Sequence, residues 1–345
     1  MKAKALVIKP EQTEKMRLFL SKENLIRKDL KIKEREGLIY LPLRELNSKL
    51  KSYKIIDMDF EENKRKPKSI NEVISIPKKL KNELPTSYDT IGNIILLKLK
   101  NDLMSYKEEI GKSLIKINKN IKTVCLVKPV KGEYRVRDIE IIAGENTTKT
   151  IHKEYGLKYE VDIKKTYFSP RLATERKRVA DLVKPGEIIV DMFAGVAPFS
   201  ITIAKYASPK IIYALDKNEF AVKYAKKNIK INNLLDKIEV IHCNAKNVKS
   251  ILNEKEVKAN RIIMNLPFSA HLFFKNALEI VDNFFILHYY DILKDDQIKE
   301  RIEILKKVAE EKRIFLAKFD VRKIKTYAPR EFYIGIDIKA KKMPM

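Results

Sequence analysis

Two carboxylates and a glycine are spaced in this sequence as a nucleotide-binding loop requires. Asp191 ends the apolar run Ile188-Ile-Val190, and Gly195 follows just before an apolar-periodic segment at 198–206. Asp216 ends the next apolar run, about twenty residues after the glycine. In doubly wound sheets such an acid accepts the hydroxyls of a ribose at the carboxyl ends of the strands. We therefore expect a ribose-containing cofactor at this edge of a sheet.

A second polar group follows a later strand. The tetrapeptide Asn265-Leu-Pro-Phe268 closes the apolar strand expected at 261–266. The Asn265 amide can both donate and accept, so it can hold either the cofactor or the edge of a base. Pro267 fixes the direction of the chain, and Phe268 offers an aromatic face. The alternative is an ordinary strand-to-helix turn with an Asn cap.

The elements that position these groups fill residues 166–345. Strands are expected at 188–193, 210–216, 238–243, 261–266, 284–290, 313–324 and 331–340. Helices are expected at 172–183, 198–206, 219–229, 246–252, 270–281 and 295–311. Strand–helix units that end in a closing hairpin predict a class I (Rossmann-like) methyltransferase sheet with an antiparallel last strand. A dehydrogenase is poorly supported, because Gly-X-Gly-X-X-Gly is absent.

Two smaller α/β or α+β domains are expected before this sheet. The first has predicted strands at 5–8, 38–43 and 55–60 and helices at 11–21 and 43–52. The charged run 61–68 indicates a linker. The next region has predicted helices at 70–84 and 103–117, a turn followed by a strand over 87–99, strands at 123–127 and 134–142, and a hairpin of 148–154 and 157–163. We therefore predict domains at 1–62, 63–165 and 166–345, the first a docking or binding unit.

The charge of the chain favours a polyanionic partner. Lys and Arg number 72 against 46 Asp and Glu, a net charge of +26, and nucleic acid is the commonest partner of so basic a protein. A Lys-rich compositional bias is the alternative. No long apolar run predicts a membrane span or a signal peptide, so a cytoplasmic protein is expected. The two cysteines and four dispersed histidines predict neither a disulfide nor a metal site.

The motifs of residues 132–330 resemble, in order, those of the archaeal and eukaryotic tRNA (guanine-37, N1)-methyltransferases. They are Gly132-Glu-Tyr-Arg-Val-Arg137, Ala143-Gly-Glu-Asn146, Thr150-Ile-His-Lys-Glu154, Tyr167-Phe-Ser-Pro-Arg171, Glu175-Arg176, Asp191-Met-Phe-Ala-Gly195, Asn265-Leu-Pro267, His288-Tyr-Tyr290 and Tyr327-Ala-Pro-Arg330. The first 60 residues resemble the small tRNA-recognition domain of the archaeal members. The resemblance implies S-adenosylmethionine as cofactor, the anticodon loop of tRNA as partner, and a monomer.

The resemblance also implies roles for individual residues. Guanine N1 carries a proton at neutral pH, so a general base must remove it, and Glu175 matches the family's base. Arg135 matches the arginine that stabilises negative charge on O6. Asn265 and Pro267 complete the implied catalytic set. The implied cofactor-binding residues are Arg176, Asp191, Phe193, Gly195, Asp216, Lys217, Asn244, Ala245 and Asn265. The implied substrate-binding residues are Arg137, Tyr167, Phe268, Tyr327 and Arg330.

Three departures from the family pattern concern the cofactor and the Asn-Pro-Pro loop. Ala197 stands where the widespread class I loop repeats a glycine, and its small side chain still permits close approach of the backbone. Asn244 replaces an Asp that reads the adenine amine, and its carbonyl accepts without charge assistance. Leu266 replaces the first proline of the Asn-Pro-Pro-Phe/Tyr loop of amino methyltransferases. Weaker cofactor binding, and no loss of activity, is the expected consequence at 197 and 244.

Three alternative functions remain open from the sequence. The enzyme could also methylate C7 of the tricyclic wyosine precursor at position 37. It could methylate an exocyclic amine, as Asn265-Leu-Pro-Phe268 suggests, without a base at N1. It could also be an RNA-binding protein without catalysis, which the presence of Glu175, Arg135 and Asp216 disfavours.

Overall fold

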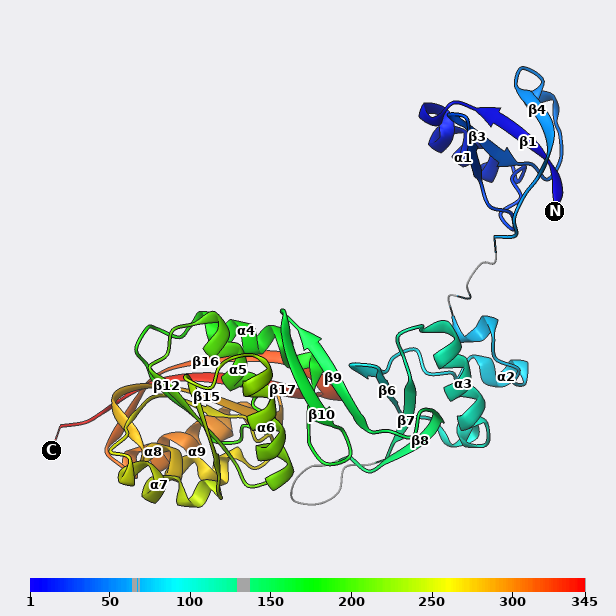
Figure 1. Ribbon diagram of the computed structural model, residues 1–345. Helices are drawn as coiled ribbons and strands as arrows, with labels where there is room; N and C mark the ends of the chain where they lie inside the picture. The colour runs from blue at the N-terminus through cyan, green and yellow to red at the C-terminus, as the bar shows by residue number, and fades with distance from the viewer. Residues whose placement is uncertain (64–66, 68, 129–136, 345) are drawn as a thin grey trace. The chain divides into compact units, whose positions relative to one another are not determined.

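The computed structural model describes residues 1–63, 67, 69–128 and 137–344 (Figure 1). The chain forms two compact units, Met1–Val73 and Ile74–Met345, hereafter the N-terminal and C-terminal units. The boundaries predicted at 62/63 and 165/166 stay predictions.

The N-terminal unit is a sheet with a helix packed against it. Its strands are β1 (Lys2–Ile8), β2 (Lys33–Arg35), β3 (Leu38–Pro42) and β4 (Lys54–Asp59), in the order β2-β3-β1-β4. Helix α1 (Thr13–Lys22) buries Met16 and Leu20 in its core. The helix predicted at 43–52 is wrong: only the short turn η2 (Ser48–Leu50) forms there. The Asn47 side chain accepts the backbone N–H of Lys49, which favours a turn over a helix.

The C-terminal unit begins with a small mixed sheet. Its strands are β5 (Asp89–Ile91), β6 (Ile94–Leu97), β7 (Thr123–Val127) and β8 (Ile139–Gly144), with helix α3 (Lys107–Ile117) packed on β7 and β8. The segment 87–99, predicted as a turn followed by a strand, forms the two antiparallel strands β5 and β6, because Gly92 turns the chain at a φ of +55°. The helix predicted at 70–84 is also wrong, since only η3 (Ile70–Glu72) and α2 (Lys78–Lys81) form. Pro77 lacks the N–H that a continuous helix requires.

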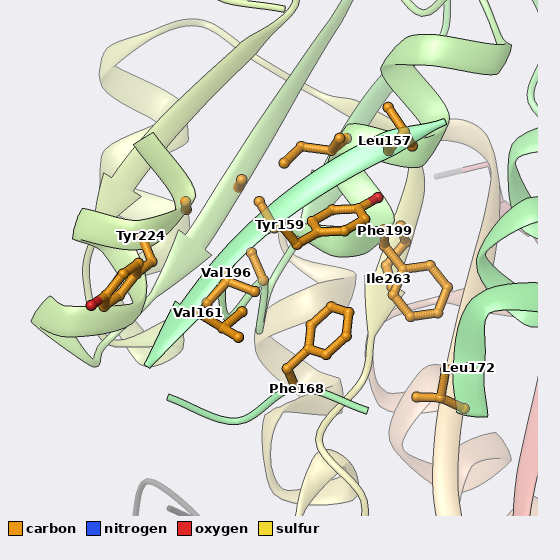
Figure 2. Close-up of a cluster of buried hydrophobic side chains, with 14 of the residues drawn as sticks. Leu157, Tyr159, Val161, Phe168, Leu172, Val196, Phe199, Tyr224 and Ile263 are labelled. Carbon is orange, nitrogen blue, oxygen red and sulfur yellow. The ribbon is translucent and has the colours of Figure 1, made fainter. Parts of the chain in front are cut away.

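A hairpin of β9 (Lys149–Glu154) and β10 (Leu157–Asp162) follows and packs on the large sheet's helices. Figure 2 shows Leu157, Tyr159 and Val161 of β10 in one buried cluster with Phe168, Val196 and Phe199. The Tyr159 hydroxyl lies 3.1 Å from Thr202 Oγ1 of α5 (Pro198–Tyr206). The hairpin therefore shares its core with residues 166–345.

The large sheet has the strand order β13-β12-β11-β14-β15-β17-β16. Its strands are β11 (Ile188–Asp191), β12 (Ile211–Asp216), β13 (Ile238–His242), β14 (Ala259–Met264), β15 (Val281–Lys294), β16 (Ile314–Ala328) and β17 (Glu331–Lys342). The strands from β13 to β15 are parallel, whereas β17 runs antiparallel to both of its neighbours. The predicted doubly wound sheet with an antiparallel last strand is confirmed.

Helices cover both faces of this sheet (Figure 1). One face carries α4 (Ala173–Asp181), α5 and α6 (Glu219–Ile231), and the other carries α7 (Val248–Glu254), α8 (Phe274–Leu278) and α9 (Gln297–Glu311). Successive side chains of a strand point to opposite faces. Ile189 and Ile263 accordingly join the first core, and Val190 and Ile262 the second. This explains why the strands read as unbroken apolar runs.

Candidate active site

A cleft of about 480 Å³ lies at the carboxyl ends of β11, β12 and β14. The residues that were predicted from the sequence and line it are Tyr167, Arg176, Phe193, Gly195, Asp216, Lys217, Asn244, Ala245, Asn265, Pro267 and Phe268. The parallel register of the strands brings together groups that lie far apart in the sequence, as in other doubly wound sheets.

Asp216 holds the glycine turn of this cleft. Its Oδ2 accepts the N–H of Gly195 at 2.7 Å, and its Oδ1 accepts the N–H of Asn218 at 2.9 Å. Burial raises the pKa of Asp216 above its ordinary value, although these two N–H groups act in the opposite direction. Each carboxylate oxygen has a second lone pair, so the group can also accept the two hydroxyls of a ribose. The Asp216 carboxylate therefore fits the ribose of a nucleoside cofactor.

Asp191 does not line the cleft but is buried beneath its loop. The Ser200 hydroxyl at the start of α5 donates to Asp191 Oδ2 at 2.9 Å. Burial, reinforced by the nearby Asp216 carboxylate, raises the pKa of Asp191 to about 7. Its position indicates a supporting role, tying β11 to the helix that follows the loop.

Ala197 adopts a left-handed conformation, with φ +64°, and is fully buried. An alanine is disfavoured there, and a β-branched residue more so. We expect Ala197→Val to lower the free energy of unfolding by about 2 kcal/mol and to weaken cofactor binding. Ala197→Gly should stay within about 1 kcal/mol of the wild type, because relief of strain opposes the loss of a buried methyl group. Urea unfolding and calorimetry would measure both, and equal effects of the two substitutions would contradict this reading.

Asn244 caps the turn η6 (Ala245–Asn247), where its Oδ1 accepts the N–H of Lys246 at 3.0 Å. The side chain thus shares its carbonyl between the backbone and any ligand. Cys243 lies beside it in the cleft lining, and burial raises the pKa of its thiol to about 11. The thiol is therefore protonated at neutral pH and is a poor nucleophile.

The Asn265 loop is fixed by two residues that the sequence reading missed. The Tyr333 hydroxyl of β17 donates to Asn265 Oδ1, which leaves the amide N–H₂ as the side of Asn265 that a ligand can meet. Asp291 is fully buried and accepts the N–H of Phe268 at 2.9 Å. The Tyr289 hydroxyl donates to the same carboxylate at 2.7 Å. Asp291 directly follows the motif His288-Tyr-Tyr290, which was the one signal that could have revealed it.

Phe268 presents an aromatic face beside the cleft. Its backbone is left-handed, with φ +72°, and its side chain is 45% exposed. The ring packs edge-on against Tyr327 at 5.5 Å between centroids. Tyr327 does not itself line the cleft, and Arg330 lies in the exposed turn between β16 and β17. The pair of rings can stack with a nucleobase.

Glu175 is buried on α4 and does not line the cleft. Arg178 forms a bidentate pair with its carboxylate, with Nε and Nη2 at 2.8 and 2.7 Å. The Tyr290 hydroxyl also donates to Glu175 Oε1 at 2.8 Å. Burial, and then the Glu175 carboxylate, raise the pKa of Tyr290 well above its ordinary value, so the phenol remains a donor.

The Arg178 guanidinium also reaches a second carboxylate, that of the half-buried Asp337. Its Nη1 lies 2.8 Å from Asp337 Oδ2, while His288 Nδ1 lies 2.6 Å from Asp337 Oδ1. His288 Nε2 faces Arg261 Nη1 at 2.7 Å and must accept, so His288 is neutral and donates from Nδ1. Burial lowers the pKa of His288, which agrees with this tautomer. The i, i+3 spacing of Glu175 and Arg178 was visible in the sequence, but the Asp337 contact was not.

Arg176 lines the cleft although it is only 1% exposed. It pairs with Glu154 through Nε at 2.8 Å and Nη2 at 2.6 Å, and both of its terminal nitrogens donate to the Ser169 carbonyl. Burial acts to raise the pKa of Glu154, but His152 and Arg176 outweigh it and hold the pKa below its ordinary value. Arg176 therefore ties α4 to the β9–β10 hairpin.

Two arginines were predicted on the strand at 134–142. Arg137 lies over the Tyr167 ring, 5.3 Å from its centroid, and its Nη2 lies 3.8 Å from Asp89 Oδ2. Arg135 lies outside the described residues. Of this pair, the structure thus places only Arg137 beside a residue of the cleft.

Among residues 1–63, 67, 69–128 and 137–344, no group of three or more His, Cys, Asp or Glu side chains has the geometry of a metal site. Within the same ranges, no helix is long and apolar enough to cross a membrane.

Comparison with known proteins matches two stretches of the chain to described domains. Residues 150–317 match the TRM5/TYW2 methyltransferase domain. Residues 70–147, which begin just before this unit, match the TYW2 N-terminal domain. The second match covers the small mixed sheet. The first match covers all the residues that line the cleft.

Relatives extend the similarity to the whole chain. The tRNA (guanine(37)-N(1))-methyltransferase Trm5b of Methanocaldococcus jannaschii is 39% identical over 98% of each chain. A tRNA(Phe) (4-demethylwyosine(37)-C(7)) aminocarboxypropyltransferase of the same organism is 33% identical over 73% of this chain and 97% of its own. The structure of aTrm5 solved in complex with tRNALeu is 38% identical, has a TM-score of 0.80, and covers 98% of this chain and 99% of that one. The resemblance inferred from the motifs is therefore confirmed: this chain belongs to the TRM5/TYW2 methyltransferase family.

Proposed function

We propose that this protein transfers the methyl group of S-adenosylmethionine to N1 of guanosine 37 in tRNA. The observation that carries the proposal is that one cleft is lined both by the pair Gly195 and Asp216 and by the Asn265–Phe268 loop. The first suits a ribose and the second suits a planar base. The name of the relative that is 39% identical over nearly the full chain supports the same reaction.

The residues of the cleft divide between the parts of the cofactor. Asp216 would accept the ribose hydroxyls, and Asn244 and Ala245 would contact the adenine. Phe193, Gly195 and Lys217 line the same cleft, and Asp191 supports its loop. Arg176 and the Asn265 amide would hold the methionine end. When bound, S-adenosylmethionine would supply a methyl group on a sulfonium: the attacking nitrogen bonds to the methyl carbon as its bond to sulfur breaks, and the neutral thioether leaves.

Removal of the guanine N1 proton is the step that these side chains must perform. We assign it to Glu175, with Arg135 stabilising the negative charge that develops on O6. Glu175 is engaged by Arg178 and Tyr290 in the structure. It must therefore exchange one of these partners for the N1–H as the base enters. Asn265 and Pro267 position the base against the cofactor.

The RNA side of the proposal rests on the aromatic and basic residues beside the cleft. Tyr167 and Phe268 line it, Tyr327 packs on Phe268, and Arg137 lies over Tyr167. With Arg330 they would hold the anticodon loop. We further assign residues 1–62 to recognition of the tRNA body, and we expect a monomer acting in the cytoplasm, as the motif resemblance implies.

Labelled cofactor distinguishes this reaction from that named for the aminocarboxypropyl-transferring relative. One sample of S-adenosylmethionine carries the label in its methyl group and a second carries it in its carboxyl group. We expect only the methyl label to appear in tRNA. Transfer of the carboxyl label would replace the proposal with aminocarboxypropyl transfer, and a methylated wyosine precursor would add the second activity considered from the sequence.

A further inference from the structure

A second cavity of about 470 Å³ lies beside the cofactor cleft, and the proposed function gives this cavity no role. We call it the lysine pocket, and it is lined by Lys164, Lys165, Lys217, Asn218, Glu219, Phe220 and His242. Lys217 and Asn218 line the cleft as well. The pocket lies at the carboxyl ends of β12 and β13, on the rim where the cleft also opens. The two cavities are therefore neighbours that share one wall.

Hydrogen bonds to the backbone hold the walls of the pocket in place. The Asn218 side chain donates to the Lys165 carbonyl at 3.0 Å and accepts the N–H of Phe220 at 3.0 Å. His242 Nε2 lies 3.0 Å from the Lys217 carbonyl, so this nitrogen donates. These contacts join the segment at Lys165, the turn after β12 and the end of β13. The pocket is thus a formed feature of the fold and does not depend on one exposed loop.

The pocket carries an excess of positive charge. Lys164 and Lys165 are exposed, and neither forms an ion pair within the part of the chain that the structure describes. The Lys165 ammonium lies over the Phe220 ring, 4.4 Å from its centroid. Among the lining residues, Glu219 is the single acid. Three lysines against one glutamate make a site that attracts an anion.

We infer that the lysine pocket binds a phosphate group of the RNA backbone, close to the nucleotide that occupies the cleft. This inference rests on the proposed function, since it presumes an RNA substrate. Lysine ammonium groups neutralise phosphates in RNA complexes. Phe220, which is 38% exposed, adds an aromatic face of the kind on which unpaired bases stack. The exposed Phe220 ring beside Lys165 favours RNA over a free phosphate compound, because unpaired RNA presents a base as well as a phosphate.

A salt series with paired lysine variants tests the inference. The test variant is Lys164→Ala/Lys165→Ala in the full chain, and the control is Lys299→Ala/Lys307→Ala. Both remove two exposed lysines, but the control pair lies on α9, which packs against β15 and β16 toward the other edge of the sheet. The affinity for an unmodified tRNA transcript is measured from low to high salt.

We expect the test variant to bind the transcript about 10-fold more weakly at low salt than the control variant does. The slope of log affinity against log salt should become shallower by about 0.7, because one phosphate contact to unpaired RNA contributes about 0.7. Its affinity for S-adenosylmethionine should equal that of the wild type. A salt slope identical to the control's would overturn the inference.

A second arm separates the two sources of phosphate. Adenosine monophosphate and inorganic phosphate are titrated into the wild type and the test variant by calorimetry. Binding that only the test variant loses, together with unchanged RNA affinity, would assign the pocket to a small phosphate compound and overturn the RNA reading. Failure of the proposed function would show differently, as absence of N1-methylguanosine from the wild-type reaction, whereas failure of this inference leaves the wild-type product unchanged.

Discussion

Glu175→Gln is expected to lower the rate of methyl transfer by about 10²- to 10⁴-fold, the range for loss of a general base. Gln keeps the size of the side chain and can still accept the Tyr290 hydroxyl, so the fold should survive. It cannot take the N1 proton of guanine. Single-turnover methyl transfer to a tRNA transcript would measure the rate, and calorimetry should show little change in cofactor affinity.

Glu279→Gln is the matched control for this substitution. Glu279 pairs with Lys312 at 2.7 Å and lies outside α4; like Glu175, it does not line the cleft. Its replacement should leave the rate unchanged. Full turnover by Glu175→Gln would remove Glu175 from the reaction and favour methylation of an exocyclic amine, which does not require a base at N1.

Asp216→Ala is expected to weaken S-adenosylmethionine binding by about 100-fold, as loss of two hydrogen bonds to a charged group predicts. The substitution also leaves the N–H groups of Gly195 and Asn218 without their carboxylate partner. Calorimetric titration of the cofactor would measure the change. Asp236→Ala, at an exposed position after α6, is the control and should bind normally. Unchanged affinity of Asp216→Ala would show that the ribose is held elsewhere.

The large sheet was predictable because its strands are buried on both faces. Their apolar runs end at the residues that line the cleft, so Asp216 and Asn265 could be placed at one edge without any coordinates. Gly195 marked the turn between β11 and α5. Order along the chain and the parallel register were sufficient for these residues.

Other parts of the site depend on contacts between distant elements. Asp337 meets Arg178 across 159 positions of sequence, and Tyr333 meets Asn265 across 68. No periodicity carries such information, so the contacts of Arg178 with Asp337 and of Tyr290 with Glu175 were not predicted.

The two wrong helices have local causes. At 43–52 the Asn47 side chain competes for a backbone N–H, and at 70–84 Pro77 interrupts the pattern. Apolar spacing outweighed both signals in the prediction, although each was visible in the sequence.

The most direct test of the proposed function is identification of the methylated nucleoside. Labelled S-adenosylmethionine is supplied with an unmodified tRNA transcript that has guanosine at position 37, and in parallel with the same transcript carrying adenosine there. We predict N1-methylguanosine from the first transcript and no methylation of the second. Methylation of the adenosine transcript, or of any nucleoside other than guanosine 37, would contradict the proposal.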